Sequence, residues 1–409
     1  MNDAPAHPVA TPTAPRGSVG EVFVAFLKLG LTSFGGPIAH LGYFRDELVV
    51  RRRWLDEAAY VELVALCQFL PGPASSQVGF ALGLQRAGWG GALAAWMAFT
   101  LPSALLMLLF ALGAASLGGP LGSGLINGLK IVAVAIVAHA VWGMARTLCP
   151  DRERIAIALG AVWLVAFLTG SVGQLGAIVL GGIAGTLLFR TIQPSPAAPV
   201  FFPLSPRVGF IAGGAFVALL VLLPLFTFIA GSGGSLALFD AFYRAGALVF
   251  GGGHVVLPLL ETEVVHTGRI GADEFLAGYG AAQALPGPLF TFAAYLGALA
   301  DMAPGAIVGA IIALVAIFVP GLLILIALLP FWNRLRNAPR MQAALRGTNA
   351  AVVGILAAAL YDPVFTSAVA SPAHFALALA GFIALSMWKM PPWAVVVLCA
   401  LAGPLLPTG

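Results

Sequence analysis

The chain has 409 residues, of which 60% are hydrophobic and only 9% are charged, and its formal net charge is +4. A mean hydropathy of +0.99 is too high for a chain folded around one soluble core. The few Lys and Arg residues are scattered through loops, which excludes the basic patch that a nucleic-acid-binding protein requires. The composition therefore predicts a polytopic membrane protein.

The chain begins with a polar tail rich in Pro and Ala, residues 1–18, which lacks the basic stretch and apolar core of a signal peptide. We predict that this tail is disordered. Since a bilayer crossing takes about 20 apolar residues, and helices satisfy their own backbone groups in lipid, the predicted fold class is all-α. The sequence contains about 13 hydrophobic segments, at 19–36, 58–84, 88–117, 122–146, 154–170, 172–189, 207–230, 236–252, 272–300, 303–331, 342–361, 370–388 and 391–406.

A Pro-rich linker at 191–207 interrupts the hydropathy midway along the chain. We place the domain boundary there. The first membrane repeat is then 19–190, and the second is 208–409 with an additional leading helix.

The two halves share sequence in matching order. "AFLKLGLTSFGG" (25–36) aligns with "AFYRAGALVFGG" (241–252), with six identities in twelve. "QFLPGP" at 68–73 returns as "QALPGP" at 283–288, and "NGLKIVAVAIVAHAVW" is matched by "RGTNAAVVGILAAALY" late in the second half. A repeat of this length indicates duplication of a whole unit.

Seven predicted segments separate the start of one repeat from the start of the next, and an odd number predicts two inverted-topology repeats. If the N-terminus is cytoplasmic and every segment crosses, nearly all Lys and Arg residues, including Arg86, fall on the cytoplasmic side. The exceptions are Arg45, Arg51, Arg52 and Arg53. A re-entrant hairpin at 58–84 would remove the exception but would change the side of every later loop.

The Pro-Gly-Pro motifs predict broken helices, because Pro removes a backbone donor and Gly tolerates unusual dihedral angles. Non-helical backbone survives at membrane depth where it lines a cavity, and inverted-repeat transporters place such breaks at a central site. A helix that restarts after a break offers free N–H groups to an anion. The residues predicted to bind the anion at these breaks are Gly35, Gly36, Gly251, Gly252, Gln68, Pro71, Gly72, Pro73, Ser75, Ser76, Gln283, Pro286, Gly287, Pro288 and Thr291.

Lys28 and Arg244 occupy equivalent positions of the two repeats, each near the middle of an apolar segment. A charge there is costly, which favours a role as countercharge to an anion. The alternative is that both side chains snorkel to the interface. Lys130 is a weaker candidate, because its counterpart Asn349 is neutral. His40 and His254 follow the Gly pairs at unequal spacings, which favours local hydrogen bonding over a proton-carrying role.

No motif for ATP binding, metal binding or hydrolysis is present, so we predict that the protein is not an enzyme and needs no cofactor or metal. Cys67, Cys149 and Cys399 lie far apart and are expected to be packing residues.

The duplicated pairing of F-G-G with a downstream Q-x-L-P-G-P, together with "RGTNAAVVGILAAAL", resembles the long-chain chromate ion transporters from about residue 19 to 406. The resemblance implies a multi-pass protein of the bacterial inner membrane that exports chromate, driven by the proton-motive force. The expected partners are a small oxyanion, chromate or sulfate, and the lipid bilayer, and a homodimer stays open. The alternatives are a carrier of sulfate or another oxyanion and an uncoupled anion channel.

Overall fold

The computed structural model describes residues 17–114, 119–168, 170–189, 204–231, 233–250, 253–300, 305–332 and 338–406. Nearly all of the predicted disordered tail, most of the predicted linker, and both Gly251 and Gly252 lie outside these residues. All regular structure in the described ranges is helical, which confirms the all-α fold class.

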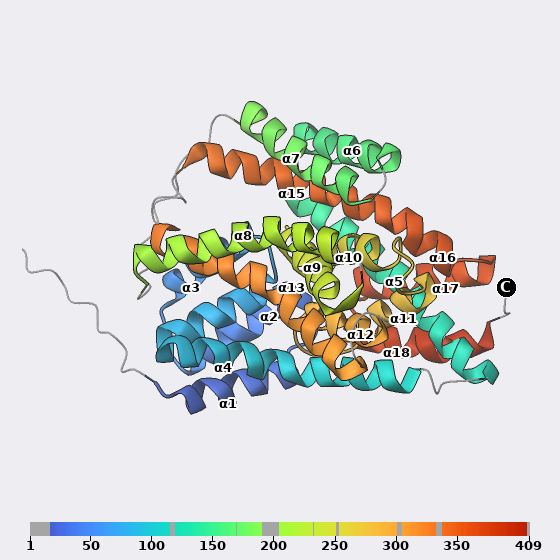
Figure 1. Cartoon of the computed structure of the whole chain (residues 1–409). Helices are drawn as coiled ribbons and strands as arrows, with labels where there is room; N and C mark the ends of the chain where they lie inside the picture. Colours follow the sequence, from blue (N-terminus) through green and yellow to red (C-terminus); the bar gives the residue numbers. More distant parts are fainter. Residues whose placement is uncertain are drawn as a thin grey trace, which may run out of the picture.

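The helices of the two halves form one body, with α4 running along its lower edge in Figure 1. The first half contains α1 (Val19–Thr32), α2 (Gly36–Phe44), the π-helical turn η1 (Arg45–Arg51), α3 (Glu57–Phe69), α4 (Ala74–Ala114), α5 (Gly119–Leu148), α6 (Arg152–Phe167) and α7 (Ser171–Leu188). The second half contains α8 (Pro206–Ala230), α9 (Gly234–Ala247), η2 (Gly253–Val255), α10 (Val256–Val264), α11 (Ala272–Ala282), η3 (Leu289–Thr291), α12 (Phe292–Leu299), α13 (Ala306–Leu328), η4 (Leu329–Phe331), α15 (Pro339–Ala359), η5 (Leu360–Phe365), α16 (Thr366–Ala368), α17 (Pro372–Ser386), α18 (Pro392–Ala402) and η6 (Gly403–Leu405).

Several helices are long and apolar enough to cross a bilayer, which makes this a multi-pass membrane protein. Among the described residues, five such spans are Ala74–Gly113, Gly122–Leu148, Pro206–Ile229, Ala306–Phe331 and Pro339–Ala368, and shorter apolar helices accompany them. The predicted segments 58–84 and 272–300 are each divided in two at the Pro-Gly-Pro motif, as the breaker residues predicted.

Residues 17–86 fold back twice. Glu21, near the start of α1, accepts a hydrogen bond from Trp54 Nε1 at 3.0 Å and another from Arg86 at 3.1 Å. The guanidinium groups of Arg52 and Arg86 both lie over the Trp54 ring. The segments 19–54 and 57–86 are therefore two hairpins that begin and end on the same side.

The placement of Arg45, Arg51, Arg52 and Arg53 opposite Arg86 applied only if the segments 19–36 and 58–84 both cross the bilayer. The structure brings Arg52 and Arg86 to the same Trp54 ring, which fits the alternative of a re-entrant hairpin at 58–84. Each segment instead supplies arms of a hairpin, because the Gly pair and the Pro-Gly-Pro motif turn the chain back.

Helix α4 is itself a tight hairpin of a first arm (74–86) and a second arm (88–114). Ala87 and Gly88 have non-helical dihedral angles. A Cβ built on Gly83 would lie 2.4 Å from the carbonyl oxygen of Gly91, so only glycine lets the two arms pack this closely. The second arm is the first element that can cross the whole bilayer.

The second arm of α4 and its counterpart α13 run antiparallel. Ala95, near the start of the second arm, lies in one apolar cluster with Leu325 at the end of α13. Ala111, near the end of the second arm, lies in the other large cluster with Ala310 at the start of α13. Equivalent helices that point in opposite directions support the predicted inversion of the two repeats.

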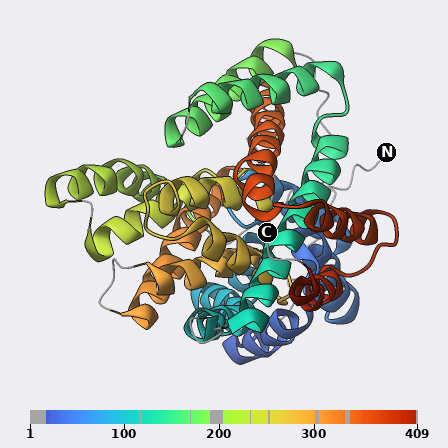
Figure 2. The same cartoon turned by 90° about the vertical axis from the view of Figure 1, so that its right-hand side faces the viewer.

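The outer helices repeat the same arrangement. A Cβ on Gly128 of α5 would lie 2.3 Å from the Cys399 oxygen of α18, and one on Gly347 of α15 would lie 2.0 Å from the Gly181 oxygen of α7. Figures 1 and 2 show α6 and α7 lying against α15, while α17 and α18 lie against α5. The helix pair that ends each half thus covers the long helix of the other half.

Candidate functional site

The two Pro-Gly-Pro breaks are joined crosswise to the F-G-G breaks by backbone hydrogen bonds. Gly72 donates its N–H to the Val249 carbonyl at 2.7 Å, and Gly287 donates its N–H to the Ser33 carbonyl at 2.9 Å. Ser33 and Val249 each directly precede the Phe-Gly-Gly of their repeat. The prediction that the breaks of the two halves converge is therefore confirmed.

Glycine is required at both central positions. Gly72 has φ 110° and Gly287 has φ 94°, in the left-handed region that other residues avoid. A Cβ on Gly72 would lie 2.8 Å from Gly321 Cα, and one on Gly287 would lie 2.8 Å from Ser103 Oγ. Gly35 and Gly36, with φ of 94° and 80°, turn the chain between α1 and α2 in the same way.

A cluster of buried polar side chains of the first half lies beside the two breaks. His40 Nδ1 lies 3.4 Å from Ser75 Oγ, and the His40 ring packs edge-on against Phe99. Gln77 Nε2 donates to the Pro71 oxygen at 2.9 Å and to the Gly321 oxygen at 2.8 Å. The members of this polar cluster, all almost completely buried, are Ser33, His40, Ser75, Ser76, Gln77, Thr100 and Ser103.

Several atoms of the polar cluster have no hydrogen-bond partner within the described part of the chain: Ser33 Oγ, His40 Nε2, Ser76 Oγ, Gln77 Oε1 and Thr100 Oγ1. A buried polar atom without a partner costs about 1–3 kcal/mol, so such a group of atoms indicates a place where a ligand or water binds. The first N–H groups of α4 also lack an intrahelical acceptor, since a helix leaves them free. Together they offer the donors that a tetrahedral oxyanion needs.

The second half lacks this polar cluster. In the register of the two Q-x-L-P-G-P motifs, Ser75 corresponds to Phe290 and Gln77 to Phe292, both buried. Thr291, the counterpart of Ser76, donates its hydroxyl to the Pro288 oxygen at 2.9 Å. The chemistry of an anion site is therefore concentrated in the first half.

The two predicted countercharges each contact a carboxylate. Lys28 Nζ lies 2.6 Å from Glu47 Oε2. Arg244 contacts Asp240 Oδ2 at 3.1 Å and Glu263 Oε2 at 2.8 Å. Each of the two cations therefore has a carboxylate partner in this structure. Their role as countercharges to an anion stays a prediction.

The remaining predicted residues lie at or beside the breaks. Lys130 of α5 pairs with Asp273 at the start of α11, at 2.5 Å, so it is also compensated. Gln68 is exposed, whereas Gln283 is partly buried and its Nε2 has no partner among the described residues. The structure thus brings the first break, its serines and Gly287 together, and leaves Gln68 and Lys130 outside the polar cluster.

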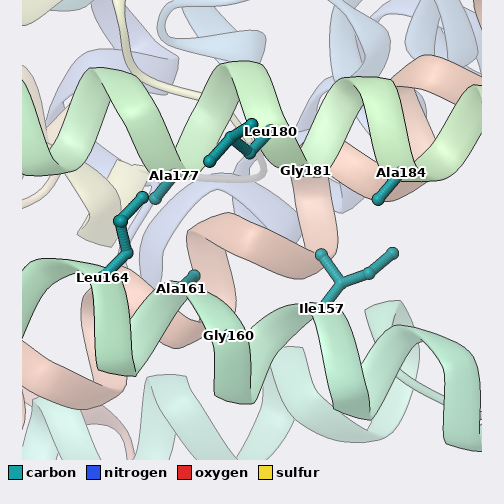
Figure 3. Close-up of a pocket in the computed structure, with 8 residues that line it drawn as sticks. All are labelled: Ile157, Gly160, Ala161, Leu164, Ala177, Leu180, Gly181 and Ala184. Atoms are coloured by element: carbon teal, nitrogen blue, oxygen red, sulfur yellow. The ribbon is translucent and has the colours of Figure 1, made fainter.

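A cavity of about 210 Å³ lies between α6 and α7, away from the breaks. Figure 3 shows that its lining side chains, such as Leu164, Leu180 and Ile157, are aliphatic. A site without polar donors cannot replace the hydration of an oxyanion. This cavity is therefore not the anion site.

A sequence model described as "Chromate transporter" matches residues 20–186 and again residues 236–404. The chain belongs to the chromate transporter family. The two matches also confirm the duplication, and α8 lies outside both of them.

Relatives match this member of the chromate transporter family over nearly its whole length. A chromate transport protein of Pseudomonas aeruginosa is 30% identical over 95% of this chain and 92% of its own. A probable chromate transport protein of Synechococcus elongatus is 31% identical, over 95% and 96%. An uncharacterized transporter of Methanocaldococcus jannaschii is 25% identical, over 83% and 82%. No solved structure matches the chain.

Sequence reasoning missed three members of the polar cluster, Ser33, Thr100 and Ser103. Ser33 could have been found, because it directly precedes the first F-G-G motif of the repeat. Thr100 and Ser103 lie in an apolar run near Pro102, and only the close approach of Gly287 to that helix brings them to the breaks.

Proposed function

We propose that the protein exports chromate across the bacterial inner membrane in exchange for protons, and that the anion binds in the polar cluster at the first break. The observation that carries this proposal is the group of buried hydroxyl and imidazole groups of the polar cluster that have no partner among the described residues, Ser33 Oγ, His40 Nε2, Ser76 Oγ and Thr100 Oγ1. The family membership supports chromate as the substrate. Sulfate, a similar tetrahedral oxyanion, is the second candidate.

The charge of the first hairpin supports the same site. Lys28, Arg51 and Arg52 all contact the single carboxylate of Glu47, so this group of four side chains carries excess positive charge. A dianion that leaves water loses hydration worth many kcal/mol, while one helix N-terminus returns about 0.3–2 kcal/mol. Positive charge near the path of the anion therefore favours its entry.

The pseudo-symmetry supports a carrier in which the halves rearrange around the fixed breaks. Because the crosswise hydrogen bonds of Gly72 and Gly287 join one half to the other, movement of either half must act on both breaks. A channel would conduct without such coupling.

Chromate and sulfate fluxes into liposomes that contain the purified protein test this proposal, with and without an imposed pH gradient. We expect chromate flux that responds to the gradient, and loss of flux in Ser76→Ala. Thr186→Val is the matched control, because Thr186 donates its hydroxyl within its own exposed helix. Equal flux in Ser76→Ala and Thr186→Val would remove the polar cluster as the anion site, and flux independent of the gradient would indicate a channel.

A further inference from the structure

A second chain of hydrogen-bonding side chains lies beside the second break, separate from the polar cluster. His254 Nδ1 of η2 lies 2.8 Å from the Tyr279 hydroxyl of α11. His139 of α5 is within electrostatic range of His254, and its Nδ1 lies 2.9 Å from Ser386 Oγ of α17. Four elements thus contribute two hydrogen-bonded pairs, His254–Tyr279 and His139–Ser386, which together are called the polar chain.

The contact with Tyr279 allows the tautomer of His254 that can bind a proton. The Tyr279 hydroxyl can accept a hydrogen bond from His254 Nδ1–H. In that tautomer the lone pair of His254 Nε2 is free to take up a proton.

The polar chain reaches from the break toward one end of the protein. Ser386 is the last residue of α17, and the next residues, Met387 and Trp388, are largely exposed. The His139–Ser386 pair therefore joins α5 to this end of α17, within electrostatic range of His254.

His254 also lies next to the contact between the two halves. A Cβ on Gly253 would lie 3.2 Å from Pro37 Cγ, so the backbone of η2 packs against the start of α2. Helix α2 carries His40 of the polar cluster. A new charge on His254 would therefore act on the segment that positions one wall of the anion site.

We propose that His254 is the proton-binding residue that couples this transporter to the proton gradient. Nε2 takes a proton from water on one side of the membrane and forms an imidazolium ion, and it releases the same proton on the other side after the halves rearrange. The inference rests on the proposed function. It assigns the anion to the first half and the proton to the second, which agrees with Ile38, not a histidine, at the equivalent position of the first repeat.

Other titratable groups near η2 are accounted for. Tyr279 and His139 belong to the polar chain itself. On the neighbouring helix α10, Glu261 pairs with His266 at 2.9 Å and Glu263 pairs with Arg244 at 2.8 Å. These carboxylates have their own partners, whereas the lone pair of His254 Nε2 can bind a proton when Nδ1 donates to Tyr279.

The test compares two fluxes of chromate in liposomes that contain the full chain: exchange between equal chromate pools, and uptake driven by a pH gradient. In His254→Gln we expect exchange to persist and gradient-driven accumulation to be lost. His374→Gln is the control, because His374 only accepts the Ala370 N–H beside the start of α17. We expect it to keep both fluxes. Gradient-driven accumulation at the wild-type level in His254→Gln would overturn the inference while the proposed function stands.

Two further outcomes are separable. If the wild-type protein exchanges no chromate, the proposed function fails first. If His254→Gln loses exchange as well, Tyr279→Phe decides, because it removes the hydrogen-bonding hydroxyl but keeps the imidazole. We expect Tyr279→Phe to shift the pH dependence of gradient-driven flux, and an unchanged pH profile would overturn the inference.

Discussion

Lys28 and Glu47, 19 residues apart, form an ion pair at 2.6 Å, and the second half repeats it as Arg244 and Glu263, also 19 residues apart. The pair belongs to the repeated unit, since both members occupy equivalent positions in the two hairpins. Its surroundings differ. Three basic side chains contact Glu47, whereas Asp240 adds a second carboxylate beside Arg244.

This asymmetry separates two roles that the sequence assigned equally to Lys28 and Arg244. In Lys28→Gln, Glu47 keeps Arg51 and Arg52, so we expect little loss of stability. We expect chromate affinity to fall about tenfold, or about 1.4 kcal/mol, because excess positive charge is lost. Chromate titration of the purified protein measures this, with the exposed Lys389→Gln as control.

In Arg244→Gln we expect the opposite balance. The nearly buried Asp240 would lose its contact with the Arg244 guanidinium, and breaking a buried pair costs about 3–5 kcal/mol, less here because Arg244 is partly exposed. The melting temperature in detergent should fall more than in Lys28→Gln, with a smaller change in affinity. Equal effects of the two substitutions on affinity would favour the symmetric assignment.

The central glycines of the two breaks give a second prediction. Gly72→Leu and Gly287→Leu should abolish chromate transport while the protein still inserts, because the new side chain meets Gly321 or Ser103 and strains a positive φ. Gly214→Leu is the control, since its Cβ would meet nothing within 4 Å. Transport at the wild-type rate in both break variants, at equal expression, would show that the motifs are only kinks.

Gln77 gives a third prediction, because its side chain ties the first break to α13. Gln77→Leu removes two hydrogen bonds to buried carbonyl oxygens, each left unsatisfied at about 1–3 kcal/mol. We expect a lower melting temperature and loss of transport. Gln85 lies on the same arm of α4 but is exposed, so Gln85→Leu should change neither the melting temperature nor transport. A stable and active Gln77→Leu protein would contradict this role.

Much of the fold could be predicted, because it depends on the chemistry of short stretches of the sequence. Apolarity predicted helices, the Gly and Pro residues predicted where they break, and the repeat predicted that the breaks meet. The structure divides 19–36 and 58–84 into hairpin arms, which fits the re-entrant alternative for 58–84 and not one continuous crossing helix in each. Hydropathy measures the preference of a segment for lipid or protein interior and does not separate a crossing helix from a hairpin arm buried in the bundle.

The site was harder to predict, because its asymmetry is tertiary. The repeat suggested equal roles for both breaks. In the second repeat, however, Phe290 and Phe292 occupy the positions that correspond to Ser75 and Gln77. Those differences were visible in the alignment. What could not be seen is that Ser33, His40 and Thr100 come from three different elements to the same buried place.

The two hairpins of the first half make a fourth prediction, on topology. If they do not cross, Arg45, Arg51, Arg52 and Arg53 share the side of Arg86, and the positive-inside rule places that side in the cytoplasm. The inverted second half then places the turn between α10 and α11 on the opposite side. The four arginines that were an exception to the positive-inside rule then agree with it.

Labelling with a membrane-impermeant maleimide tests this topology. The native cysteines Cys67, Cys149 and Cys399 are buried and should give little background. We expect Arg53→Cys and Gln85→Cys, both exposed, to react in inverted vesicles, and Thr267→Cys to react in right-side-out vesicles. Labelling of Arg53→Cys and Gln85→Cys from opposite sides would mean that 57–86 crosses the bilayer. Labelling of all three from one side would mean that the halves are not inverted, and the carrier mechanism built on two opposed halves would lose its basis.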